Sequence, residues 1–237
     1  MRRVLLLVLV TIIGLASVFP TLAAPPDKDD VKLKVFVHYP RPGKPQPKPG
    51  TCDPTELTSN NYGLAGWRLP GPTQYRVNYN TIPGTVANAQ TAIARSFAVW
   101  QQVSGVTLSE GDPTTVRKYA RDGQNVVVWG NVPGGAIAVT YIWYNSTTGY
   151  AVEVDTVMGR SLPWSYTPAD NPDQVCGDLY SYDVQNILTH EVGHWMGLDD
   201  LYEYPDHDLT MYGYGDKGEL KKDTLMTGDS AGIARLY

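Results

Sequence analysis

Apolar residues recur every three or four positions between residues 85 and 103, which predicts an amphipathic helix with one buried face. The apolar positions of that face are Val86, Ala89, Ile93, Phe97 and Trp100. A second helix is predicted from about Tyr182 to Met196, with Ile187, Leu188 and Trp195 toward the core. Ser181 is the candidate N-cap of this helix, and Asp183 would complement its dipole in the first turn.

Strands are predicted between these helices. Tyr75, Val77 and Tyr79 alternate with polar residues, which is typical of a strand with one buried face. The run NVVVWG at residues 125–130 has no alternation and predicts a central strand covered on both faces. Two further strands are expected in AIAVTYIWY and YAVEVDTVM. Strands and helices in this mixture indicate an α+β domain.

The second helix carries a metal-binding pattern. His190 and His194 are four residues apart, so both imidazoles leave the same face of the helix and could bind one metal ion. A continuing helix would carry Asp200 about 15 Å beyond His190. Gly197 can end the helix in the left-handed conformation and let the chain turn back, so that Asp200 becomes the third ligand. A fourth position open to water is typical of catalytic zinc sites.

Glu191 lies beside the first histidine, where its carboxylate could accept a proton from a metal-bound water without being a ligand. Two histidines one turn apart also occur as ordinary residues without any metal. Asp199 stays an alternative third ligand to Asp200, because only one of two adjacent side chains can point at the ion.

Residues 1–24 have the features of a signal peptide, with Arg2 and Arg3 before an apolar run and small residues after it. The apolar run is short for a membrane span, which needs about 20 residues. A secreted protein is therefore expected, and a membrane anchor formed by an uncleaved segment is the alternative. The formal net charge of −5 gives no support to a nucleic-acid partner.

The segment 25–50 is rich in proline and lysine and is expected to be an extended linker or a short propeptide, with His38 an inert linker histidine. Residues 51–237 suit one domain with its own core. Cys52 and Cys176 are the only two cysteines, and a disulfide is the simplest expectation for such a pair in a secreted protein. Two free thiols, or Cys52 as a metal-capping thiolate, are the alternatives.

The stretch HEVGHWMGLDD, residues 190–200, resembles the metzincin signature HExxHxxGxx(H/D), and its flanks are similar to the matrixin branch of zinc endopeptidases. Matrixins usually have histidine as the third ligand, where this chain has Asp200. The resemblance implies a twisted, mostly parallel five-stranded sheet with an active-site helix and about two further helices. It also implies one catalytic Zn²⁺ bound by His190, His194 and Asp200, with Glu191 as the general base.

The same resemblance assigns further roles. Met211 would be the methionine of the Met-turn, which packs beneath the zinc and its histidines without coordinating, and Asp229 would tie the last helix to that turn. The segment Gly135–Tyr141 would form an exposed edge strand that pairs with an extended substrate, although an ordinary paired strand is equally open on sequence alone. Ca²⁺ is a weaker expectation, because Asp170, Asp173 and Asp178 lack a regular loop spacing.

The sequence therefore predicts a secreted, monomeric zinc endopeptidase that cleaves an extended protein or peptide substrate. No nucleic acid and no stable membrane association are expected. The alternative is a secreted or membrane-tethered zinc protein that binds a partner without proteolysis. Glu191 favours the enzyme, because a purely structural site would not need this carboxylate.

Overall fold

The computed structural model describes residues 30–43, 59–168 and 176–237. The predicted signal peptide, residues 1–24, lies outside the described residues, as do Cys52, Asp170 and Asp173. The signal peptide, the disulfide and the calcium cluster therefore stay predictions. No helix among the described segments combines the length and the apolar character that a membrane crossing requires.

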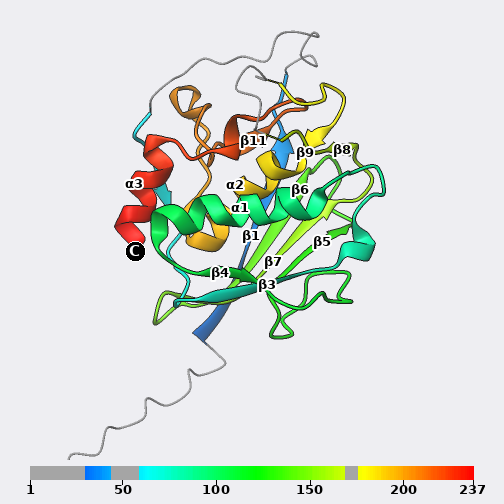
Figure 1. Ribbon diagram of the computed structural model, residues 1–237. Helices are drawn as coiled ribbons and strands as arrows, with labels where there is room; N and C mark the ends of the chain where they lie inside the picture. Colours follow the sequence, from blue (N-terminus) through cyan, green and yellow to red (C-terminus); the bar gives the residue numbers. More distant parts are fainter. Residues whose placement is uncertain (1–29, 44–58, 169–175) are drawn as a thin grey trace, which may run out of the picture.

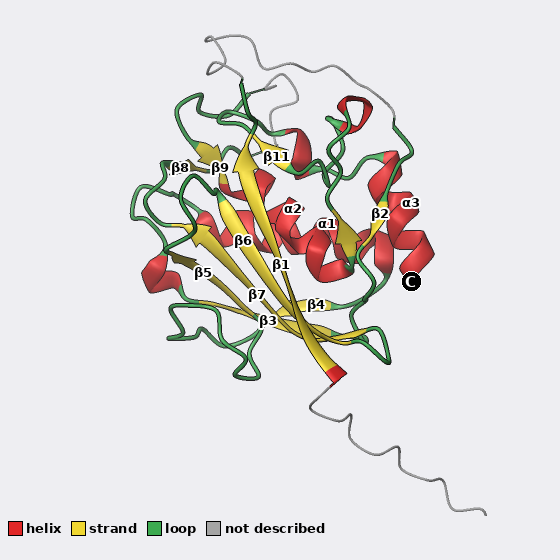
Figure 2. Ribbon diagram, turned by 180° about the vertical axis from the view of Figure 1, so that it is seen from behind, coloured by secondary structure: helices red, strands yellow, loops and turns green. Residues whose placement is uncertain are grey.

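A mixed seven-stranded sheet is the centre of the fold, with the strand order β11-β1-β6-β7-β5-β3-β4 (Figure 2). Its strands are β1 (Val31–Pro40), β3 (Thr73–Val77), β4 (Leu108–Glu110), β5 (Val126–Gly130), β6 (Ala138–Asn145), β7 (Tyr150–Gly159) and β11 (Tyr214–Gly215). β6 is antiparallel to both of its neighbours, β1 and β7, and the other neighbouring strands run parallel. The α+β class is confirmed, but the sheet has seven strands instead of the five expected.

Three α-helices are described: α1 (Ala89–Ser104), α2 (Val184–Met196) and α3 (Thr227–Leu236). α1 and α2 lie on the same face of the sheet (Figures 1 and 2). They also contact each other, because the Trp100 indole donates to the Thr189 carbonyl oxygen at 2.8 Å. The smaller elements are β2 (Gly63–Leu64), β8 (Trp164–Ser165), β9 (Tyr182–Asp183), β10 (Leu198–Asp199), η2 (Tyr79–Thr81), η3 (Tyr204–Asp206) and η4 (Lys221–Asp223).

The core lies between the sheet and the helices, and the predicted apolar face of α1 points into it. Ala89, Ile93, Phe97 and Trp100 are all buried. α1 begins at Ala89, four residues later than predicted, after Asn88 in the left-handed conformation. β5 is buried at every residue, which confirms the prediction of a covered central strand. Buried side chains from both layers thus fix α2 beside the sheet.

α2 is buried along its whole length and has a different N-cap from the one predicted. Asp183 accepts a hydrogen bond from the Asn186 amide at 3.1 Å, and Ser181 lies outside the cap. At the other end Gly197 adopts a φ of 100°, as the sequence predicts. A Cβ there would overlap the Trp67 carbonyl oxygen, so glycine is required on two grounds.

β1 contradicts the expectation of an extended linker for residues Val31–Pro40. It pairs with β6 from Val31, opposite Asn145, to His38, opposite Ala138. Its end also pairs with β11. β6 is therefore an ordinary paired strand and not the exposed edge that the resemblance implied, while the short propeptide stays a prediction.

Candidate metal centre

Three predicted ligands converge at the C-terminal half of α2. A carboxylate oxygen of Asp200 lies 3.2 Å from His190 Nε2 and 3.5 Å from His194 Nε2. The potential ligand atoms of this group all lie within 4.8 Å of one another. Both imidazoles are buried. The turn at Gly197 thus brings the third side chain back to the helix, as the spacing predicts.

Each histidine is oriented by a backbone carbonyl. His190 Nδ1 lies 2.8 Å from the Thr210 carbonyl oxygen, and His194 Nδ1 lies 2.9 Å from that of Leu198. A carbonyl only accepts, so both Nδ1 atoms carry a proton, and the Nε2 atoms are the nitrogens that face Asp200. Outer hydrogen bonds of this kind fix the ligating nitrogen of metal-bound histidines.

The convergence of three lone-pair donors fits a divalent metal. His190 Nε2 and Asp200 Oδ1 are buried and have no hydrogen-bond partner among the described residues. Ligands at about 2.05 Å in a tetrahedron are about 3.3 Å apart, close to the 3.2 Å and 3.5 Å seen here. Two imidazoles and one carboxylate are also a donor set suited to Zn²⁺.

The ionisation of His190 and Asp200 agrees with this donor set, whereas that of His194 is shifted the other way. Burial alone would lower the pKa of His194, but Asp200, Glu191 and the Leu198 carbonyl together raise it above its usual value. Burial lowers the pKa of His190 to about 4, which keeps its imidazole neutral at pH 7. Burial alone would raise the pKa of Asp200, but His194 and His190 together hold it well below its usual value. Neutral histidine and ionised aspartate are the forms that bind metals.

Asp199, the alternative ligand, points elsewhere. Its carboxylate lies 3.5 Å from the Lys34 ammonium, in a pair that is more than one-third exposed on both sides. Asp200 is in addition held by Tyr202, whose hydroxyl donates to Oδ2 at 3.1 Å. Oδ2 is thereby engaged, and Oδ1 faces the histidines.

Met211 packs under α2, where the resemblance expects the Met-turn. It is buried, and a Cβ at Gly193 would overlap its sulfur. The Asp229 carboxylate of α3 accepts the amides of Thr210 at 2.9 Å and Met211 at 3.1 Å. The link between α3 and this turn is therefore present as expected. The carbonyl oxygen of Thr210 also accepts from His190 Nδ1. Asp229 therefore holds in place the residue that orients His190.

The Glu191 carboxylate lies beside the three ligands and is fully buried. Its Oε2 accepts from the Thr140 hydroxyl of β6 at 2.6 Å, and Thr140 contacts Thr156 at 2.8 Å. Burial raises the pKa of Glu191 to about 7, against the opposing effects of His194 and the Thr140 hydrogen bond. A carboxyl with a pKa near 7 is matched to proton transfer at neutral pH.

Two further residues were missed by the sequence analysis. His38, expected to be inert, is buried, with Nδ1 3.1 Å from Glu191 Oε1 and its ring centroid 4.0 Å from that of His190. Lys222 is also buried, and its ammonium lies 3.2 Å from His38 Nε2. His38, His190 and Glu191 form a second group of potential ligands. No local pattern marks His38 or Lys222, because their contacts join residues far apart in the chain.

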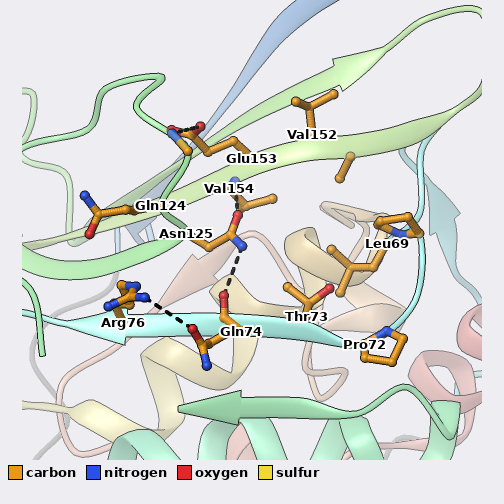
Figure 3. Close-up of a pocket in the computed structure, with 13 residues that line it drawn as sticks. Leu69, Pro72, Thr73, Gln74, Arg76, Gln124, Asn125, Val152, Glu153 and Val154 are labelled. Atoms are coloured by element: carbon orange, nitrogen blue, oxygen red, sulfur yellow. Dashed lines mark hydrogen bonds between the residues drawn. The ribbon is translucent and has the colours of Figure 1, made fainter. Parts of the chain in front are cut away.

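A separate hollow of about 280 Å³ opens beside β3 and β7 and contains none of these residues (Figure 3). Its polar groups hydrogen-bond to one another: the Asn125 amide donates to the Gln74 carbonyl at 3.0 Å and accepts from the Val154 amide at 2.8 Å. These bonds leave the hollow without convergent unpaired groups, so the candidate chemistry lies at α2.

No protein-family model matches the chain, and no curated protein sequence matches it.

Proposed function

We propose that this protein is a secreted, zinc-dependent endopeptidase of the matrixin-like metzincin type. The observation that carries the proposal is the convergence of His190, His194 and Asp200 beside the buried carboxylate of Glu191. A structural zinc site would use a fourth protein ligand and would need no adjacent base. Three ligands with an adjacent carboxylate suit metal-assisted hydrolysis.

Zn²⁺ at these ligands would lower the pKa of a water molecule and polarise the carbonyl group of a peptide bond. Glu191 is the residue that would accept the proton of that water and deliver it to the leaving amine. A carboxylate oxygen of Glu191 lies within 4.8 Å of a His190 ring nitrogen, so a water in the site can reach it. Thr140 holds the second oxygen of Glu191 and thereby orients the first.

The family assignment is supported by local features that go beyond the five-residue HExxH pattern. The left-handed turn at Gly197, the buried Met211 under α2 and the Asp229 carboxylate at that turn all follow the metzincin pattern. The presence of Asp200 at the third ligand position is the main difference from most matrixins. A carboxylate donates more charge than an imidazole, so the bound water should be less acidic than at a site with three histidines.

Replacement of the base tests the proposal. Glu191→Gln should keep zinc bound at one ion per chain, while casein hydrolysis falls by about 10²- to 10⁴-fold because no group accepts the proton. Each protein is assayed as the full chain and after cleavage at a protease recognition sequence inserted after Lys44, because β1 covers the histidines: Phe36 stacks on His194 at 3.8 Å and His38 lies over His190 at 4.0 Å. Zinc is measured by elemental analysis.

Glu203→Gln makes the same substitution at an exposed position and should leave the zinc content and the rate of casein hydrolysis unchanged. If Glu191→Gln hydrolyses casein at the wild-type rate, Glu191 is not the base. If the wild-type protein binds zinc but hydrolyses nothing in either form, the alternative of a non-proteolytic zinc protein replaces the endopeptidase.

A further inference from the structure

β1 lies directly over the candidate metal centre. It is held between β6 on one side and β11 on the other (Figure 2). It is antiparallel to β6 and parallel to β11, so its backbone bridges the two elements that flank the centre. A free β6 edge would present unpaired backbone groups to which an extended peptide can add as a strand. β1 occupies that edge.

Two side chains of β1 cover the histidines. The Phe36 ring is stacked on His194 with a centroid distance of 3.8 Å and an interplanar angle of 10°. The His38 ring lies over His190 at 4.0 Å. Both covering side chains are buried, with exposed fractions of 5% and 2%. A peptide carbonyl from another molecule has no path to the ligands from this side while β1 is in place.

His38 also engages the proposed base. The Lys222 ammonium donates to the carbonyl oxygens of Tyr212 at 2.6 Å and Tyr214 at 2.8 Å. Its third proton points to His38 Nε2 at 3.2 Å, which makes Nε2 the acceptor and leaves the ring proton on Nδ1. His38 Nδ1 therefore donates to Glu191 Oε1 at 3.1 Å.

Both Glu191 oxygens are consequently occupied, because Oε2 already accepts from Thr140. The oxygen that would receive a proton from water is the one held by His38. β1 thus blocks the centre in two ways, by covering the ligands and by holding the base.

The outward face of β1 carries exposed apolar side chains. Leu33 and Val35 are 48% and 41% exposed, so the strand buries only Phe36 and His38 deeply. Lys34 forms an ion pair with Asp199 at 3.5 Å, and Arg41, which follows the strand, forms one with Asp216 at 3.3 Å. Partly exposed pairs of this kind add little stability, so the strand is attached mainly through its backbone and two side chains.

We propose that β1 is an autoinhibitory strand that occupies the substrate edge of β6, and that His38 holds Glu191 until the strand is displaced. The proposal rests on the proposed function, since it identifies the β6 edge with the substrate position of the endopeptidase. Displacement would free the β6 edge, the faces of both histidines and Glu191 Oε1 in a single event.

The test uses the full chain with the recognition sequence of a specific protease inserted after Lys44. The protein is folded, cut and separated from its N-terminal fragment. A fluorescent peptide of residues 30–42 is then titrated into the zinc-free cut protein, where it cannot be hydrolysed. It should bind, while peptides with Phe36→Ala or His38→Ala should bind at least about 10-fold more weakly. Leu33→Ala changes an exposed side chain and should bind within about 2-fold of the unchanged peptide.

Hydrolysis and binding of labelled casein complete the test. With zinc, the cut protein should hydrolyse casein at least about 100-fold faster than the full chain. Added peptide of residues 30–42 should lower the rate of hydrolysis again. Without zinc, casein should bind the cut protein and not the full chain. If only the binding difference is found, β1 covers the β6 edge and the endopeptidase function fails. Equal casein binding by both forms overturns the proposal, as does unfolding of the cut protein, which would make β1 a permanent strand.

Discussion

At the scale of single residues, Asp199 and Asp200 show how one step along the chain separates two chemical roles. Asp199 lies in β10 and pairs with the amine of Lys34 near the surface. Asp200 follows the strand, and its Oδ1 is buried between two imidazoles, with no hydrogen-bond partner in the part of the chain that the structure describes. Both residues are aspartates, so replacing each in turn with asparagine removes the same charge. The two variants then differ only in the position of the change.

Asp200→Asn should weaken zinc binding by more than about 100-fold, because loss of outer-shell partners alone costs about 10- to 100-fold and this change removes a charged ligand. Asp199→Asn should change zinc affinity by less than about 3-fold, since its contribution is a screened surface charge. Competition with a chromophoric chelator measures both affinities. Equal losses in the two variants would mean that net charge, and not coordination by Asp200, governs binding.

The spacing of His190, Glu191, His194 and Asp200 was sufficient to predict their proximity. The two histidines share one helix, and one glycine turn returns the aspartate, so the geometry is local. His38 could not be placed in this way, because it is 153 residues from Glu191 and 184 from Lys222. Contacts at that separation depend on strand pairing, which no local period encodes.

At the scale of elements, α2 and the Met211 turn approach closely enough that Gly193 has no room for a side chain. A Cβ there would overlap the Met211 sulfur and lie 2.9 Å from the Trp100 ring. Gly193 lies one residue before His194, on the buried helix. The approach of Met211 therefore fixes the distance between α2 and the turn that holds His190.

Gly193→Ala should destabilise the protein by up to about 2 kcal/mol. Alanine favours a helix by about 1 kcal/mol over glycine, but overpacking in a tight core costs about 1–3 kcal/mol, and here two side chains resist movement. Urea denaturation measures the change. Met211→Ala in the same chain should recover part of the loss, and Gly84→Ala, with open space around it, should stay within about 0.5 kcal/mol of the wild type. A stabilised Gly193→Ala would show that the turn yields easily.

The elements themselves were predicted unevenly. Both long helices follow from their apolar periods and β5 from an unbroken apolar run, but β1 was taken for a linker because prolines and lysines surround it. Apolar residues do recur at every second position of its sequence VKLKVFVH, but this alternation predicts the wrong face of the strand as the buried one. Leu33 and Val35 lie outward, and the buried positions are Phe36 and His38. The site that β1 covers decides which of its faces is buried, and the strand's own pattern does not.

At the scale of the whole molecule, the centre joins parts of the chain that lie apart in sequence. α2 supplies the two histidines, the segment after Gly197 supplies Asp200, and the Thr210 carbonyl supplies the support of His190. α3 closes the arrangement through Asp229. A metal ion bound here would connect these parts of the second half of the fold. Its removal should therefore lower the free energy of unfolding of the entire chain.

Removal of the metal by a chelator should therefore lower the melting temperature. Zinc at about 1,000 times its Kd stabilises the folded state by about 4 kcal/mol, since the unfolded chain does not assemble the three ligands. For a chain of 237 residues each kcal/mol corresponds to about 2–4 °C, so the expected fall is about 8–16 °C. Differential scanning calorimetry, with and without added zinc, measures it. Asp200→Asn, with a Kd at least about 100-fold higher, meets the same zinc at no more than about 10 times its Kd, so zinc stabilises it by at most about 1.4 kcal/mol and the fall should be at most about 3–6 °C. A wild-type protein that melts at the same temperature with and without zinc would show that the three side chains do not hold a metal.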